Sequence, residues 1–157
     1  MELDGTVQMS LKDLPQAPVD GDLRSRLSFM DGDRLYAVLV AALPEGVSMA
    51  SATPQDFDTD TFLQAGGSAD AMLVEIGRRD DGGDALYVVS TRPADLSGGR
   101  TQTYRYADVV APVYPGELMS WEEALPIFVH YVRNGQTLPP GVWLRDSDSD
   151  SSPSFQK

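Results

Sequence analysis

Hydrophobic and polar positions repeat with a helical period in one long stretch of the chain, from Ser120 to Asn134. Its apolar residues follow i, i+4, i+7, i+8 and i+11 spacing, which predicts an amphipathic helix lying on a sheet. These residues are Trp121, Leu125, Phe128, Val129 and Val132. Ser120 and Glu123 form a capping-box pair at the start, and Asn134-Gly135 predicts a left-handed stop at the end.

Pro126 conflicts with this helical pattern. Inside an ideal helix a proline removes one N–H hydrogen bond at a cost of ~3 kcal/mol. We therefore expect a kink at Pro126, or a short turn at 121–124 after which Pro126 restarts the helix.

The N-terminal part of the chain predicts strands and turns. Residues 1–33 contain Pro15, Pro18 and repeated Asp-Gly pairs, which favour short strands or extended segments over helices. Residues 34–43 form the most apolar run and predict a buried central strand. Residues 44–70 are polar and rich in Pro and Gly, and a short helix could begin at Thr53-Pro54.

The middle of the chain carries the clearest hairpin pattern. Residues 71–77 and 85–91 predict two strands joined by the Gly-rich turn at 78–84. Polar and tyrosine positions alternate in residues 100–106, which predicts a half-exposed strand beside that hairpin. Residues 141–144 predict a short final strand.

These elements predict an α+β fold in which an antiparallel sheet packs against one principal C-terminal helix. The chain has 157 residues, of which 41% are hydrophobic, a size that suits a single domain. We place this domain at residues 1–145. Residues 146–157 are rich in Ser and Asp, and we expect them to be a disordered acidic tail because they have too few apolar groups to pack.

The composition of the chain predicts its compartment and the charge of its partners. The chain has no cysteine, no apolar run long enough for a membrane span and no signal-peptide pattern at its start, so we expect a cytoplasmic protein without membrane contact. Its formal net charge is −12, with acidic residues spread along the chain. Such a field repels nucleic acid and accelerates capture of a basic protein, although solubility alone also explains it.

Motifs for catalysis or cofactor binding are incomplete. Two runs have the alternate aspartates of a calcium loop, namely Asp56, Asp58, Asp60 and Asp146, Asp148, Asp150. The first has Thr61 and Gly67, and the second Ser151 and Lys157, where the loop requires Gly and Glu. His130 is the single histidine, and no nucleophile and base are placed together by the pattern. We therefore expect no enzymatic activity, no metal and no cofactor.

The segment from Gln102 to Trp143 follows the order of a known family. It has the strand pair Tyr104 and Tyr106, then Pro112, Pro115, Ala124, Phe128, Gly135, Pro139 or Pro140, Val142 and Trp143. This order resembles the Imm1 family of immunity proteins from bacterial polymorphic toxin systems. The chain departs from the family pattern because Val142 directly precedes Trp143. The resemblance implies an α+β protein that binds and blocks a toxin encoded beside it; partners of the family include nucleic-acid deaminases and nucleases.

Two functions follow as hypotheses. The first is an immunity protein that neutralises a cognate, basic toxin domain by occluding its active site. The second is a small-molecule or regulatory binding domain with an apolar pocket between the sheet and the helix. That pocket would be lined by Met30, Tyr36, Met72, Tyr87 and Trp121.

Two acidic loops are the candidate partner-binding residues under the first hypothesis. The preferred loop, residues 54–60, places the aromatic ring of Phe57 among the carboxylates of Asp56, Asp58 and Asp60. An aromatic anchor within a charged rim is typical of protein interfaces. The second candidate is the predicted hairpin tip, with Asp80, Asp81 and Asp84.

Overall fold

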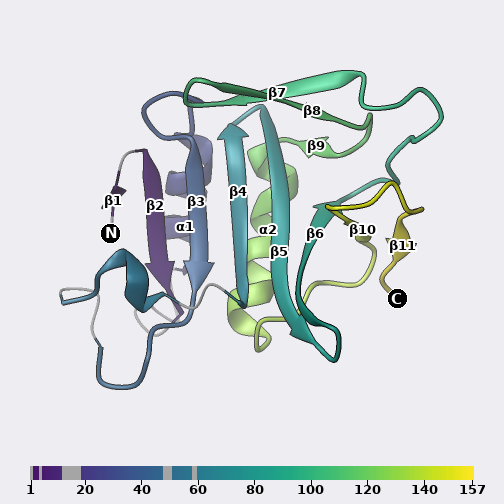
Figure 1. The fold of residues 1–157 in the computed structure, drawn as a ribbon. Coiled ribbons are helices and arrows are strands. Elements are labelled where there is room, and N and C mark those ends of the chain that lie inside the picture. The colour runs from purple at the N-terminus through teal and green to yellow at the C-terminus, as the bar shows by residue number, and fades with distance from the viewer. Residues whose placement is uncertain (1, 4, 12–18, 48–50, 58–59) are drawn as a thin grey trace.

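The computed structural model describes residues 2–3, 5–11, 19–47, 51–57 and 60–157, which form a mixed sheet with two helices (Figure 1). The sheet has nine strands in the order β1-β2-β3-β4-β5-β6-β10-β11, with β9 paired to β5. They are β1 (Glu2–Leu3), β2 (Thr6–Ser10), β3 (Ala37–Ala41), β4 (Phe62–Ser68), β5 (Ala71–Asp80), β6 (Gly83–Ser90), β9 (Leu118–Met119), β10 (Trp143–Asp146) and β11 (Ser154–Phe155). All pairs are antiparallel except β2 and β3, which are parallel. The α+β class is thus confirmed, and the sheet is mixed rather than purely antiparallel.

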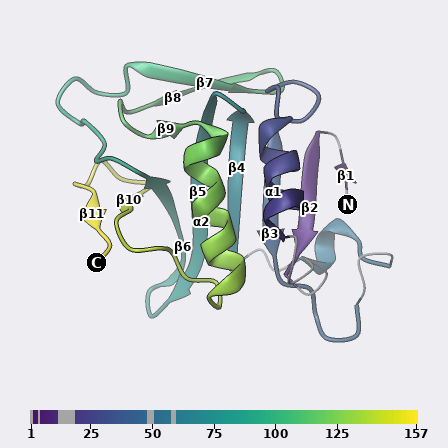
Figure 2. The same cartoon turned by 180° about the vertical axis from the view of Figure 1, so that it is seen from behind.

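Two helices, α1 (Val19–Ser28) and α2 (Trp121–Arg133), lie side by side on one face of the sheet (Figure 2). An ion pair of 2.7 Å joins Arg133 of α2 to Asp20 of α1. Leu23 and Leu27 of α1, Phe128 and Tyr131 of α2, and Val38, Leu63 and Val74 of the sheet form the main core. No helix in the described ranges is long and apolar enough to cross a membrane.

Helix α2 begins and ends where the sequence predicts. The Ser120 hydroxyl accepts the N–H of Glu123, and the Glu123 carboxylate accepts the N–H of Ser120, so the capping box is complete. At the other end Gly135 adopts a φ of +63°, and the N–H of Gln136 returns to the carbonyl of Tyr131. The helix continues through Pro126 without interruption, so the expected restart at this residue does not occur.

Ser120→Ala is expected to lower the free energy of unfolding by about 0.5–2 kcal/mol, because it removes the acceptor of one orphan N–H group. Urea titration measures the change, with Ser152→Ala, which alters an exposed serine near the C-terminus, as the matched control. Equal stability of the two variants would show that the capping box contributes nothing to the fold.

Helix α1 was not predicted, because the Asp20-Gly21 pair suggested a turn. From Asp20 to Ser28, only Leu23 and Leu27 belong to the buried core, so the apolar stripe of this part of the helix is narrow. Gly21 lies inside the helix and lowers its intrinsic propensity. Tertiary packing against α2 therefore stabilises α1 where its local sequence does not. One of these contacts places the Arg24 guanidinium 5.7 Å from the centre of the Trp121 ring.

The predicted hairpin is confirmed, with longer strands than expected. Strands β5 and β6 pair as far as Asp80 and Gly83, which leaves Asp81-Gly82 as the turn. The predicted strand at 34–43 is confirmed in part as β3, and the one at 141–144 shifts to β10. A 3₁₀ helix, η1 (Pro54–Asp56), stands where a short helix was considered.

The strand expected at 100–106 forms, but it does not join the hairpin. It is β7 (Gln102–Tyr106), which pairs with β8 (Val109–Val113) in a separate two-stranded sheet that we call the ribbon. The expected neighbour position beside β6 is taken by β10. Residues 107–119, predicted as a connecting loop, therefore contain strands β8 and β9.

The structure differs from the expectation of a disordered tail at 146–157. Asp146 belongs to β10, and β11 pairs with β10 by the register Trp143↔Phe155 and Leu144↔Ser154. The rings of Trp143 and Phe155 lie 5.0 Å apart. Backbone pairing and one aromatic contact thus order a segment whose composition is polar.

Candidate partner-binding face

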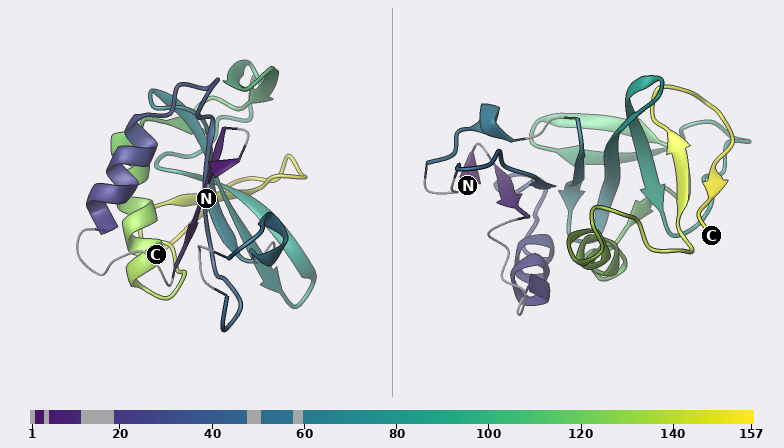
Figure 3. Two further views of the ribbon diagram at one scale, coloured as in Figure 1. Left: turned by 90° about the vertical axis from the view of Figure 1, so that its left-hand side faces the viewer. Right: turned by 90° about the horizontal axis from the view of Figure 1, so that it is seen from below.

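The sheet face opposite the helices, which we call the open face, is only partly covered. Alternate residues of four neighbouring strands lie on it in one row, namely Leu39, Gln64, Glu75 and Val88. The ribbon lies over one end of this face, and the tip of the β5–β6 hairpin extends from the other end (Figure 3, left). Two projecting elements therefore flank the open face. Binding residues are often carried by such elements on a rigid sheet.

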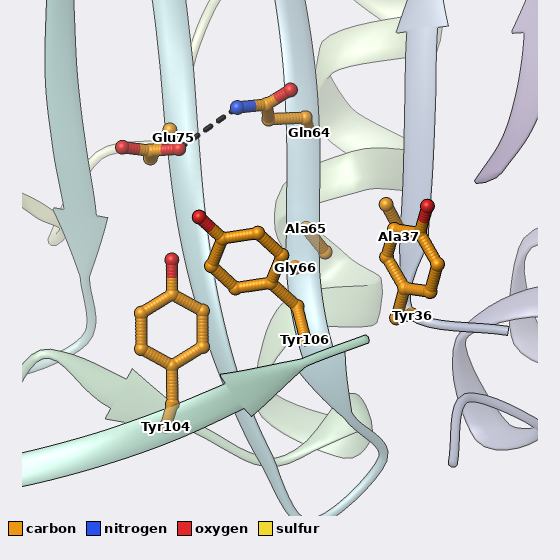
Figure 4. A pocket seen from close by; sticks show the side chains of 8 residues that line it. All are labelled: Tyr36, Ala37, Gln64, Ala65, Gly66, Glu75, Tyr104 and Tyr106. Carbon is orange, nitrogen blue, oxygen red and sulfur yellow. Dashed lines mark hydrogen bonds between the residues drawn. The ribbon is translucent and has the colours of Figure 1, made fainter. Parts of the chain in front are cut away.

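Three tyrosines and a glutamate line a hollow of about 230 Å³ on the open face, which we call the tyrosine pocket. Its lining residues are Tyr36, Ala37, Gln64, Ala65, Gly66, Glu75, Tyr104 and Tyr106. The ring centres of Tyr104 and Tyr106 are 5.5 Å apart, and those of Tyr36 and Tyr106 are 6.4 Å apart. Figure 4 shows the hydroxyl ends of Tyr104 and Tyr106 directed from the ribbon towards Glu75.

The local sequence explains how these tyrosines meet. Tyr104 and Tyr106 alternate along β7 and so share the ribbon side that faces the sheet, while Thr103 and Arg105 are exposed. Gly66 lies beneath Tyr104, where an added Cβ would come 3.8 Å from the ring. Because Gly66 has no side chain, the space beneath the Tyr104 ring stays open as part of the pocket.

Glu75 is the charged group of the tyrosine pocket. One of its oxygens accepts a hydrogen bond of 2.8 Å from the Gln64 amide, its partner in the strand register. Burial is the main reason that the pKa of Glu75 is raised, and the nearby carboxylate of Glu117 adds to the shift. Burial, and secondly the charge of Glu75, also raises the pKa of Tyr104. The pocket therefore holds a carboxylate that is poorly solvated when ionised.

The acidic residues at the end of the open face form a second feature, the acidic tip, made of Asp60, Asp80, Asp81 and Asp84. Arg79 forms ion pairs with both Asp60 and Asp84, the latter at 3.1 Å. This guanidinium joins one residue of the preferred loop to the hairpin tip, so the structure brings the two predicted acidic segments together. Asp80, Asp81 and Asp84 are exposed.

The rest of the preferred loop has a structural role. Phe57 is 4% exposed and packs with Ala41 and Leu43, so it is not available as a surface anchor. The Asp56 carboxylate accepts the N–H and the hydroxyl of Thr53 at 2.7 and 2.8 Å, and these bonds lower its pKa. Asp58 lies outside the described residues.

A buried ion pair supports the region beside Glu75. The Arg145 guanidinium and the Glu117 carboxylate are 5% and 1% exposed, and their Nε and Oε1 atoms are 2.5 Å apart. Arg145 also donates to the carbonyls of Asp146 and Ser149, while the other Glu117 oxygen accepts the N–H of Tyr114. This network holds the start of the C-terminal segment against the sheet.

The remaining candidates for chemistry are dispersed. His130 is partly buried on α2, and its Nε2 lies 3.4 Å from the hydroxyl of Thr137. Among the residues that the structure describes, no three His, Cys, Asp or Glu side chains are grouped to hold a metal ion. Asp150 of the second aspartate run accepts a hydrogen bond from the Tyr114 hydroxyl at 2.5 Å and pairs with Arg100.

The apolar pocket considered in the second hypothesis does not form as predicted. Met30 and Met72 are buried in the main core, and Tyr87 and Trp121 pack against it. Of the five residues, Tyr36 alone lines the tyrosine pocket. Gln64 and Glu75 were not identified from the sequence, although the alternation of Tyr104 and Tyr106 had marked one wall of the pocket.

Comparison of the chain with family models, with curated proteins and with solved structures gives no match.

Proposed function

We propose that this chain is an immunity protein that binds a cognate toxin domain with its open face and blocks the toxin's active site. The observation that carries the proposal is the position of the tyrosine pocket and the acidic tip on the same open face (Figures 3 and 4). Tyrosine is enriched in protein interfaces, where its ring buries a large area and its hydroxyl finds a polar partner.

The charge of the chain supports a basic partner. The net charge of −12 attracts a toxin whose substrate cleft is positively charged, as clefts that bind nucleic acid are. Exposed carboxylates at the acidic tip accelerate encounter, while desolvated contacts at the tyrosine pocket slow dissociation. Residues 102–143, which resemble immunity proteins, include Tyr104 and Tyr106 of the tyrosine pocket, and this supports the proposal that the pocket contacts the toxin.

The alternative of a small-molecule binding domain has less support. Pockets for drug-sized ligands have volumes of about 300–1,000 Å³ and bury most of the ligand. The tyrosine pocket has a volume of about 230 Å³ and is only partly enclosed. It suits one inserted side chain better than a whole metabolite.

Co-expression tests the proposal. The gene beside this one is expected to encode a large secreted protein, and its C-terminal domain is produced together with this chain. A stable complex on size-exclusion chromatography, with loss of the toxin's activity in proportion to added protein, is the expected result. Absence of a complex together with undiminished toxicity would reject the proposal for that pair of genes.

A further inference from the structure

The carboxylate of Glu75 forms no ion pair within the described part of the chain. Its Oε2 atom is bonded to Gln64, and its Oε1 atom makes no hydrogen bond with any described residue. The charge of Arg145 acts on Glu75, but its guanidinium is bonded to Glu117, Asp146 and Ser149 instead. A partly buried carboxylate without a bonded counter-charge is unfavourable in the isolated protein, and direct binding of a cation would relieve this cost.

The three tyrosines that line the pocket together with Glu75 complete a site for a planar cation. Aromatic faces attract cations within about 6 Å of the ring centre, and guanidinium groups stack on them more readily than ammonium groups do. The hydroxyls of Tyr36, Tyr104 and Tyr106 make no hydrogen bond to a described residue, so their oxygens can accept from a ligand. A guanidinium has five N–H donors in one plane and can use the carboxylate and the phenols together.

The chain itself contains a filled example of this arrangement. The guanidinium groups of Arg100 and Arg145 both lie over the ring of Tyr114, at 5.1 and 5.0 Å from its centre. Carboxylates complete that arrangement, since Asp150 pairs with Arg100 and Glu117 with Arg145. The tyrosine pocket presents the same side-chain types around a space of about 230 Å³.

We propose that the tyrosine pocket binds the guanidinium group of an arginine side chain, with Glu75 as its carboxylate partner and Tyr36, Tyr104 and Tyr106 as its aromatic walls. This inference deepens the proposed function and depends on it only for the source of the arginine, which would be the basic toxin domain. An arginine inserted there would anchor the toxin at the middle of the open face, between the ribbon and the acidic tip.

The test uses the protein alone, so that its outcome does not depend on the toxin. N-acetyl-arginine methylamide is titrated into protein with ring-labelled tyrosine, and the six tyrosine signals are followed by NMR. The signals of Tyr36, Tyr104 and Tyr106 are expected to shift in a saturable way, with a dissociation constant in the millimolar range on the order expected for one charge-assisted contact. The signals of Tyr87, Tyr114 and Tyr131 are internal controls, because none of these residues lines the tyrosine pocket.

Two comparisons make the result specific. The citrulline analogue has nearly the same shape without the charge, and it is expected to leave all six signals in place. Glu75→Gln retains the size of the side chain and an acceptor for Gln64, and it is expected to weaken arginine binding about tenfold or more. Glu122→Gln removes an equal charge on the exposed side of α2, and it is expected to leave binding unchanged.

Equal shifts with the citrulline analogue, or equal affinity of Glu75→Gln and Glu122→Gln, would overturn the assignment of the guanidinium site. Shifts spread over all six tyrosines would also overturn it. None of these results would bear on complex formation with the toxin, which the co-expression experiment measures separately. Conversely, arginine binding without a toxin complex would reject the immunity function for that gene pair and leave the guanidinium site in place.

Discussion

Glu117→Gln is expected to lower the free energy of unfolding by about 3–5 kcal/mol, the largest effect on stability among the changes considered. The substitution leaves the buried guanidinium of Arg145 without its bonded carboxylate, since Arg145 is 5% exposed and Glu117 1% exposed. It also places an amide where two oxygens now accept from Arg145 and from the N–H of Tyr114. Urea unfolding, followed by circular dichroism with the m-value fitted, measures the loss.

Two controls separate burial from charge in this experiment. Arg92→Gln breaks the 2.5 Å pair with Glu123, whose side chains are 57% and 34% exposed, and is expected to cost under about 1 kcal/mol. The double change Glu117→Leu with Arg145→Met removes both charges, so it is expected to cost less than Glu117→Gln alone. A loss below about 1 kcal/mol for Glu117→Gln would show that water reaches this pair in solution.

The same ion pair explains why composition failed to predict the C-terminal segment. Residues 146–157 have few apolar side chains, and composition therefore indicated disorder. Arg145, however, is buried and requires acceptors, which the carbonyls of Asp146 and Ser149 supply. The Tyr114 hydroxyl binds Asp150 in the same way. The Tyr114–Asp150 bond spans 36 residues and the Arg145–Glu117 pair spans 28, so no local pattern encodes these two contacts.

Helices and strands marked by a pattern in their own sequence were predicted. Elements that are stabilised by contacts with residues far away in the chain were not. Helix α2 carries its own cap, stripe and stop, and the structure has all three. Helix α1 has only two core leucines, and its stability comes from α2 and the sheet. Strand β7 of the ribbon was predicted from its alternation, but the ribbon forms a separate sheet, and its Val113 and Tyr104 pack in one cluster with Leu73 of β5.

The candidate site was likewise predictable only where a local pattern marks it. Exposed carboxylates at the hairpin tip follow directly from a polar turn, and Asp81 and Asp84 are exposed as expected. Phe57 was interpreted as an exposed aromatic because its neighbours are charged, yet it fills a small core beside Ala41. The tyrosine pocket joins β3, β4, β5 and β7, so it could not be assembled before the register of these strands was known.

Reversal of charge at the acidic tip, by Asp81→Lys together with Asp84→Lys, is expected to slow association with the cognate toxin about tenfold or more at low salt. Each reversal adds two positive charges, so the pair changes the net charge from −12 to −8. The dissociation rate is expected to change little, because exposed charges mainly steer the encounter. Near 0.15 M salt, where the Debye length is about 8 Å, the difference in association rate is expected to shrink.

The matched control places the same charge change at the opposite end of the molecule. Asp70 and Glu122 are exposed. They directly follow Ala69 and Trp121, which are joined by a backbone hydrogen bond. Asp70→Lys together with Glu122→Lys is expected to slow association much less than the tip variant. Glu122 lies in the first turn of α2 and Asp70 directly before β5, whereas the acidic tip lies at the other end of β5 (Figure 2). Stopped-flow mixing over a range of salt concentrations compares the two variants. Equal slowing by both would mean that net charge alone attracts the toxin, and the acidic tip would then have no particular part in recognition.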